Sequence, residues 1–122
     1  MGLIIYTRKR ETSDIIQNFM DFYYGLQMKY LASDLLNKGL SLEQISDALI
    51  LAVKVASSSG IGVHKHFMPI YSSINREIMK DCKLSNLGYG LVLMNASPNL
   101  PVVGDFQVNI LKEFYRGRQN TL

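Results

Sequence analysis

Two histidines close together in the chain are the residues whose type and spacing best fit metal chemistry. His64 and His66 are two positions apart, so in an extended segment both side chains lie on the same side. A zinc site needs three or four protein ligands, and Cys82 or Glu77 would have to complete this one. No ligand-spacing motif is met. The sequence therefore favours solvated or hydrogen-bonded histidines over a metal site, and we expect no cofactor.

No other catalytic pattern is complete. Gly60 and Gly62 follow a predicted helix, whereas a phosphate-binding loop follows a strand. The serines of the run 57–59 would need a base to act as nucleophiles, and a turn explains them better. The single cysteine, Cys82, excludes an internal disulfide and is typical of a reducing compartment. We interpret it as a small buried residue. These observations favour a non-enzymatic protein.

Basic residues gather near both ends of the chain. Arg8, Lys9 and Arg10 form one run, and Arg116 and Arg118 lie near the other end. Such clusters bind phosphates with an affinity that falls steeply with salt. More often they are solvated ends that keep a protein soluble, and the net charge of +3 is too small to decide between the two. The five residues are the candidates for contact with nucleic acid.

Length and composition predict one globular domain over residues 1–122. Of the 122 residues, 48% are hydrophobic and 19% are charged, which fits a single core. The apolar run at residues 3–6 is too short for a signal peptide, and arginine follows it in place of a cleavage site. We therefore expect a cytoplasmic protein that does not interact with membranes.

The segment from Ser41 to Gly60 predicts a helix around which the others pack. Ser41 and Gln44 have the capping-box spacing, and nearly every residue from 48 to 56 is apolar. A helix that is apolar on nearly all sides lies inside a protein or a membrane, and this run is too short to cross a bilayer. We expect a central helix over about residues 42–58, sheltered by its neighbours and ended by Gly60.

A long first helix is predicted before the central helix. Thr12, Ser13 and Asp14 are good N-cap residues, and Asn37-Lys38-Gly39 is typical of a helix C-terminus. Aromatic residues cover more than one face of this helix: Phe19, Phe22, Tyr23 and Tyr24. Core packing explains most of them, and a self-association surface would explain the rest. We therefore expect a homo-oligomer that forms through the first helix, with residues 3–6 as a short strand or an arm.

Three further helices complete the expected fold. Pro69 begins one over about residues 69–82. Apolar residues recur there at every fourth position: Ile70, Ile74, Ile78 and Cys82. Ser85 or Asn86 caps the next helix, which runs to about Ala96, and Asp105 caps the last. With about five helices and at most a short N-terminal strand, the sequence predicts an all-α single domain.

The second half of the chain carries residues in the order and spacing of a known family. They are His66-Phe67 after Ser59-Gly60, then Arg76-Glu77-Ile78, Leu84-Ser85, Leu91, Asn95-Ala96, Pro98, Val103 and Gln107. Over about residues 30–107 this pattern resembles the DNA-damage-inducible protein D family, relatives of phage antirepressors. The aromatic-alanine-cysteine-tyrosine run usual after the serine is replaced here by Asn-Leu-Gly-Tyr, and family members are longer. The resemblance implies a non-enzymatic protein of the DNA damage response or of phage-type regulation. The implied partners are nucleic acid or DNA-repair proteins, and no catalytic residue is carried over.

A shorter stretch resembles a different class of protein. Residues 39–45, followed by an apolar helix, are similar to carboxymuconolactone decarboxylase and the alkylhydroperoxidase-D-like proteins, which are small all-α oligomers. Their redox members need a Cys-x-x-Cys pair, which Cys82 alone does not supply. This resemblance implies a non-redox relative, in which His64, His66 and Glu77 would line a ligand or metal site.

Taken together, the patterns favour a regulatory or interaction domain that contacts nucleic acid or a DNA-bound protein, and the small all-α oligomer is the alternative.

Overall fold

The chain folds into helices and a small sheet. The computed structural model describes the backbone of residues 2–121 and the side chains of residues 14–118. In chain order the elements are α1 (Gly2–Gln27), β1 (Tyr30–Leu31), the 3-10 helix η1 (Ala32–Lys38), α2 (Leu42–Ser58), the short 3-10 helix η2 (Val63–Lys65), β2 (Phe67–Ile74), β3 (Glu77–Leu84), α3 (Asn86–Met94) and α4 (Pro101–Thr121). The three strands form one antiparallel sheet in the order β1-β3-β2. The protein is therefore mixed α/β, and the predicted all-α fold class is wrong.

The error lies in residues 69–82, which were expected to be a helix. They form most of a hairpin, with Ile74 opposite Glu77 at its turn and Phe67 opposite Leu84 at its base. Apolar residues four apart share a face of a helix, but four is also an even number, so they share a face of a strand as well. Pro69 is accommodated because β2 lies at an edge of the sheet, where one side of the strand needs no partner.

Helix α2 occupies the predicted span and begins as predicted. The Ser41 hydroxyl accepts a hydrogen bond from the Gln44 backbone N–H, and the Gln44 side chain accepts one from the Ser41 N–H. A stripe of alanines, 48, 52 and 56, is buried where α2 packs against α3. Three apolar residues of α2 are exposed, however: Ile50, Leu51 and Val55. The expectation of a helix sheltered on all sides is thus wrong.

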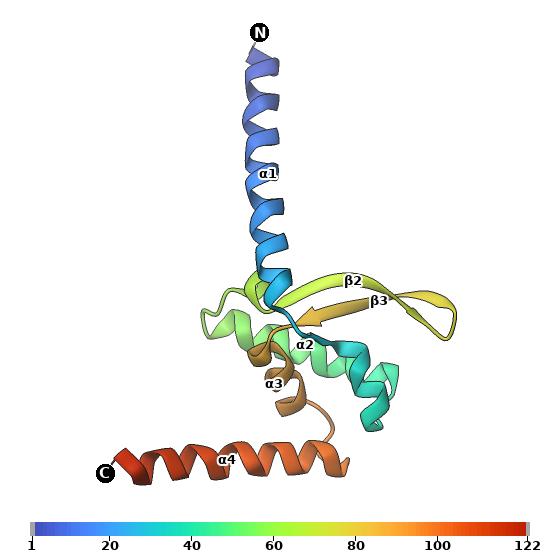
Figure 1. The fold of residues 1–122 in the computed structure, drawn as a ribbon, viewed down its shortest axis with the longest axis vertical. Helices are drawn as coiled ribbons and strands as arrows, with labels where there is room; N and C mark the ends of the chain where they lie inside the picture. Colours follow the sequence, from blue (N-terminus) through green and yellow to red (C-terminus); the bar gives the residue numbers. More distant parts are fainter. Residues whose placement is uncertain (1, 122) are drawn as a thin grey trace.

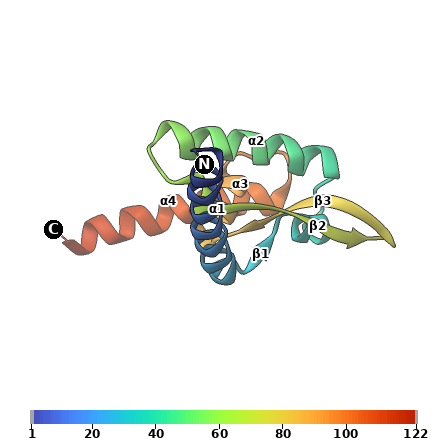
Figure 2. The same cartoon turned by 90° about the horizontal axis from the view of Figure 1, so that it is seen from above.

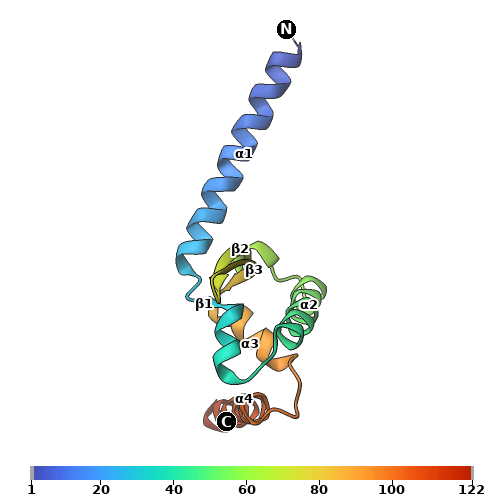
Figure 3. The same ribbon diagram turned by 90° about the vertical axis from the view of Figure 1, so that its right-hand side faces the viewer.

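One hydrophobic core connects the middle of the chain. Its fully buried larger side chains come from four elements and are Leu35, Leu84, Val92 and Val103. Figure 3 shows how η1, α2, α3 and the hairpin surround this core. Of the two predicted caps, Ser85 and Asn86, it is Ser85 that caps α3, because its hydroxyl accepts a hydrogen bond from the Gly88 N–H.

The first helix differs from the prediction at both ends. It begins at Gly2, so residues 3–6 are helical and no N-terminal strand forms there. It ends at Gln27, and the segment up to Lys38 becomes β1 and η1. Gly39 ends η1 with a φ of 100°, which is the left-handed conformation expected of a glycine at this position. Figure 1 shows α1 rising away from the body, which it contacts only near its C-terminal end.

The last helix begins at Pro101 and not at Asp105. Proline suits the first helical position because its missing N–H would have no partner there. Val103 is buried, but the side chains from Val108 to Arg118 are exposed. Figure 2 shows the outer part of α4 extending beyond the rest of the molecule. Among the described residues, none of the helices combines the length and apolarity needed to span a membrane.

Candidate nucleic-acid interface

The turn between β2 and β3 places an arginine at the tip of a projecting hairpin. Asn75 and Arg76 are its two loop residues, with φ values of 53° and 68°. Positive φ at both positions is the pattern of a type I′ turn, whose right-handed twist matches that of the strands. The second position of such a turn favours glycine, and an arginine there carries backbone strain. In Figure 1 the tip extends past the neighbouring ends of α2 and η1.

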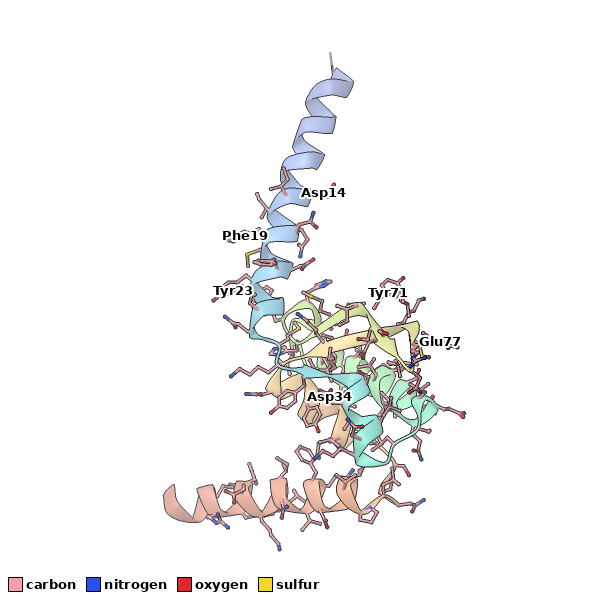
Figure 4. All side chains as sticks on the ribbon, turned by 45° about the vertical axis from the view of Figure 1, so that its right-hand side comes forward. Asp14, Phe19, Tyr23, Asp34, Tyr71 and Glu77 are labelled. Atoms are coloured by element: carbon pink, nitrogen blue, oxygen red, sulfur yellow. The ribbon has the colours of Figure 1, made fainter. Side chains whose placement is uncertain are left out.

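One face of the hairpin near the tip combines aromatic, aliphatic and basic side chains. The register places Tyr71 opposite Lys80 and Ser73 opposite Ile78, so these four residues share a face, which we call the ribbon face. All four are exposed, Tyr71 by 71% and Ile78 by 80%. Figure 4 shows Tyr71 on the hairpin and Glu77 close to its tip. An open antiparallel ribbon with this composition has the dimensions and chemistry to enter a nucleic-acid groove.

A carboxylate fastens the hairpin to the body. Asp81 on β3 accepts hydrogen bonds from the Ser33 N–H at 3.1 Å, from the Ser33 hydroxyl, from the Ser72 hydroxyl at 2.7 Å and from the Cys82 N–H at 2.7 Å. Burial acts to raise the pKa of Asp81, but these hydrogen bonds outweigh it and hold the pKa below its ordinary value. The arm is therefore anchored at η1, while the turn residues Asn75 and Arg76 are exposed.

The histidine-phenylalanine and leucine-serine pairs meet where the hairpin joins α3. His66 Nδ1 lies 2.7 Å from the Ser85 hydroxyl, and the His66 carbonyl accepts the Ser85 N–H. Gly88 lies so close that an added Cβ would be 2.5 Å from the His66 carbonyl oxygen. Phe67 and Leu84, directly opposite each other, are buried in the core. These motif residues therefore hold β2, β3 and α3 together.

Other residues of the motif also serve the fold. The Asn95 amide donates to the Leu91 carbonyl at the end of α3, and the Gln107 amide donates to the Met94 carbonyl from α4. Pro98 lies exposed in the connection between these helices. Arg76 and Glu77 are the exceptions, because they lie exposed at the hairpin tip.

The predicted metal ligands do not converge. His64 is exposed on η2, His66 is occupied with Ser85, and Glu77 lies at the far end of the hairpin from both. Burial raises the pKa of the Cys82 thiol to about 11, which disfavours the thiolate that binds metals. Within residues 14–118, no group of three or more His, Cys, Asp or Glu side chains is placed to hold a metal ion. The all-α fold implied by the shorter resemblance is also not the fold of this chain.

The two predicted basic clusters lie on different helices and are not brought together. Arg8, Lys9 and Arg10 belong to the outer part of α1, and their side chains lie outside the described residues. Arg116 forms an ion pair with Glu113 at 2.7 Å, and Arg118 lies over the Phe114 ring. Figure 1 shows the two chain ends well apart. A single phosphate-binding surface made of both ends does not form within one chain.

Sequence reasoning missed an aromatic stack beside α3. Tyr30 and Tyr89 stack with ring centroids 4.3 Å apart and 14° between their planes. Burial is the main cause that raises the pKa of Tyr89, and the neighbouring Tyr30 raises this pKa further. The pair borders an apolar groove of about 510 Å³ that also involves Phe106 and Ile110 of α4. No local sequence pattern predicts a contact between residues so far apart in the chain. The hairpin, too, was missed, because its Asn-Arg turn lacks the glycine that marks a two-residue hairpin loop.

The chain matches no model of a known protein family, and neither a curated protein nor a solved structure is similar enough to count as a match.

Proposed function

We propose that the chain is a non-enzymatic regulatory domain that acts as a homo-oligomer and contacts nucleic acid, or a protein bound to it, through the β2–β3 hairpin. The resemblance to the DNA-damage-inducible protein D family, which remains a hypothesis, favours a role in the DNA damage response or in phage-type regulation. The observation that carries the proposal is Arg76, a cationic residue held at positive φ on the tip of a projecting ribbon.

The strain at Arg76 supports a functional role. A non-glycine residue in the left-handed region costs about 1–3 kcal/mol, and such residues cluster at functional sites. Glycine would relieve the strain and would also remove the charge. An arginine at this position keeps a guanidinium at the outermost point of the arm, where it reaches phosphates or base edges.

The ribbon face adds chemistry that suits nucleic acid. Lys80 supplies a second cation on the arm, and Tyr71 presents an exposed ring on which a base stacks. Glu77 and Asp81 carry the opposing charges on β3. Asp81 is occupied by four hydrogen-bond donors, so its charge is partly neutralised within the fold. A major groove accommodates a two-stranded ribbon of this kind.

Fluorescence anisotropy with labelled duplex and single-stranded DNA tests the proposal between 50 and 200 mM salt. We expect binding that weakens with salt, and for Arg76→Gln and Lys80→Gln a log–log slope that is smaller by about 0.9 per lost phosphate contact. Lys54→Gln is the matched control, because Lys54 is also an exposed cation but lies on α2, away from the arm. Absence of binding at low salt, binding without salt dependence, or an equal effect of the control would refute the proposal.

A second variant separates strain from charge. We expect Arg76→Gly to unfold at higher urea concentration, with a gain of about 1 kcal/mol from relieved strain, and to bind DNA more weakly. A gain in stability with unchanged binding would show that the arginine at the tip does not contact the ligand.

A further inference from the structure

Helix α1 carries an apolar seam that the body of the same chain does not cover. Ile15, Phe19, Phe22 and Leu26 follow one another at intervals of four, three and four residues. This alternation is the spacing of a two-stranded coiled-coil seam. Each of the four side chains is between 65% and 68% exposed. Figure 4 shows Phe19 and Tyr23 on the part of α1 that stands clear of the body.

The body meets α1 near its C-terminal end, at positions that lie outside the seam. Gly25 is buried against Met68 of β2, where an added Cβ would lie 3.0 Å from the Met68 methyl carbon. The Lys65 ammonium lies 5.9 Å from the centre of the Tyr24 ring. These contacts fix the base of the helix on the side of Gly25. The seam residues stay outside them and need another partner.

The size of the seam fits a second copy of this chain. Ile16 and Tyr23 flank the four seam residues and are also exposed, by 59% and 49%. With about 170–200 Å² for a whole side chain of this size, the six residues expose roughly 640–750 Å² per chain. This exceeds the apolar patch of most monomers and approaches the roughly 800 Å² that each partner contributes to a standard interface. A helix of the same sequence offers the matching seam.

The direction of pairing decides where the two bodies lie. A parallel pair aligns each seam residue with its own copy and places both bodies at the same end. An antiparallel pair matches Ile15 with Leu26 and carries the partner's first residues about 18 Å past Gln27. Figure 3 shows the body to one side of that end of α1, so both directions fit the fold.

From the seam, its exposure and its area we infer that two copies of the chain associate by pairing their α1 helices along the four seam residues. The inference rests on the oligomeric part of the proposed function and not on contact with nucleic acid. One consequence concerns the first basic run. In a parallel pair, two copies of residues 8–10 would lie at the same end of the dimer, which would concentrate positive charge where a polyanion would bind.

Disulfide trapping tests the pairing in a Cys82→Ala background, which removes the native thiol. We expect cross-links between seam positions under mild oxidation. A parallel pair joins Ile15→Cys and Leu26→Cys each to its own copy, whereas an antiparallel pair joins position 15 to position 26 in a mixture of the two variants. Gln17→Cys, on the opposite face of α1, is the control and should stay uncross-linked. No trapping at positions 15 and 26, or equal trapping at position 17, would overturn the pairing along the seam.

Light scattering of the unmodified chain and of two charge variants tests the association itself. We expect a dimer for the wild type and for Gln17→Glu, and a monomer for Phe22→Glu. Because the seam lies outside the core, circular dichroism should show that the body remains folded in all three. A wild-type monomer at high concentration would overturn the inference. DNA binding measured on the same samples separates the two proposals, since the salt dependence contributed by Arg76 does not require the seam.

Discussion

Asp81 anchors the hairpin to the body, and its replacement should destabilise the fold more than the replacement of any other carboxylate that is exposed or half-buried. Its carboxylate accepts two hydrogen bonds from Ser33, one from Ser72 and one from the Cys82 N–H. Hydrogen bonds to a charged group contribute about 1.5–3 kcal/mol each, but water replaces part of this at a half-buried site. We therefore expect Asp81→Ala to cost about 3 kcal/mol in the free energy of unfolding.

The isosteric change Asp81→Asn should cost less, about 1–2 kcal/mol. The amide keeps one acceptor oxygen, and the two serine hydroxyls can rotate to accept from its N–H groups. Urea unfolding followed by circular dichroism measures both variants. Asp47→Asn on the exposed surface of α2 is the control, and its change should stay within about 0.5 kcal/mol.

The pH dependence gives a second test with a defined sign. Hydrogen bonds hold the pKa of Asp81 in the folded protein below the ordinary value of 3.8, so the unfolded chain binds the proton more readily. The stabilisation from Asp81 is therefore complete above that value and is lost as the pH falls through the lower folded pKa. The difference in stability between the wild type and Asp81→Asn should shrink as the pH is lowered from 5 towards 2.5. A constant difference, or a cost no larger than that of Asp47→Asn, would refute the assigned role.

Two further predictions concern the junction of the hairpin with α3. Gly88→Ala should destabilise by about 2 kcal/mol, because its Cβ would lie 2.5 Å from the His66 carbonyl oxygen. The Cβ of Gly90→Ala would meet only the Phe106 ring, at 3.6 Å, so this change should be neutral or stabilise the fold by up to about 1 kcal/mol. Equal urea midpoints for the two variants would contradict this packing. Cys82, buried and with its pKa raised to about 11, should react with iodoacetamide at pH 8 far more slowly than in urea, and fast labelling of the folded protein would show that the thiol is accessible.

Local patterns in the sequence correctly predicted features that depend on a few neighbouring residues. The capping box at Ser41, the span of α2, the Ser85 cap of α3 and the turn at Gly39 all follow from side chains that satisfy backbone groups within one helical turn. Such interactions are complete within four or five residues. These features can therefore be predicted from the local sequence, without knowledge of the rest of the fold.

Only the tertiary structure decided the sheet and the candidate interface. The spacing of Ile70 and Ile74 suits a helix and a strand equally, and pairing with β3 resolves the ambiguity. The hydrogen bonds from Ser33 to Asp81 join residues 48 positions apart, and no local pattern encodes them. The exposure of the seam around Phe19 likewise depends on where the body ends. Contacts between distant segments are settled by the competition for one shared core, which is a property of the whole chain.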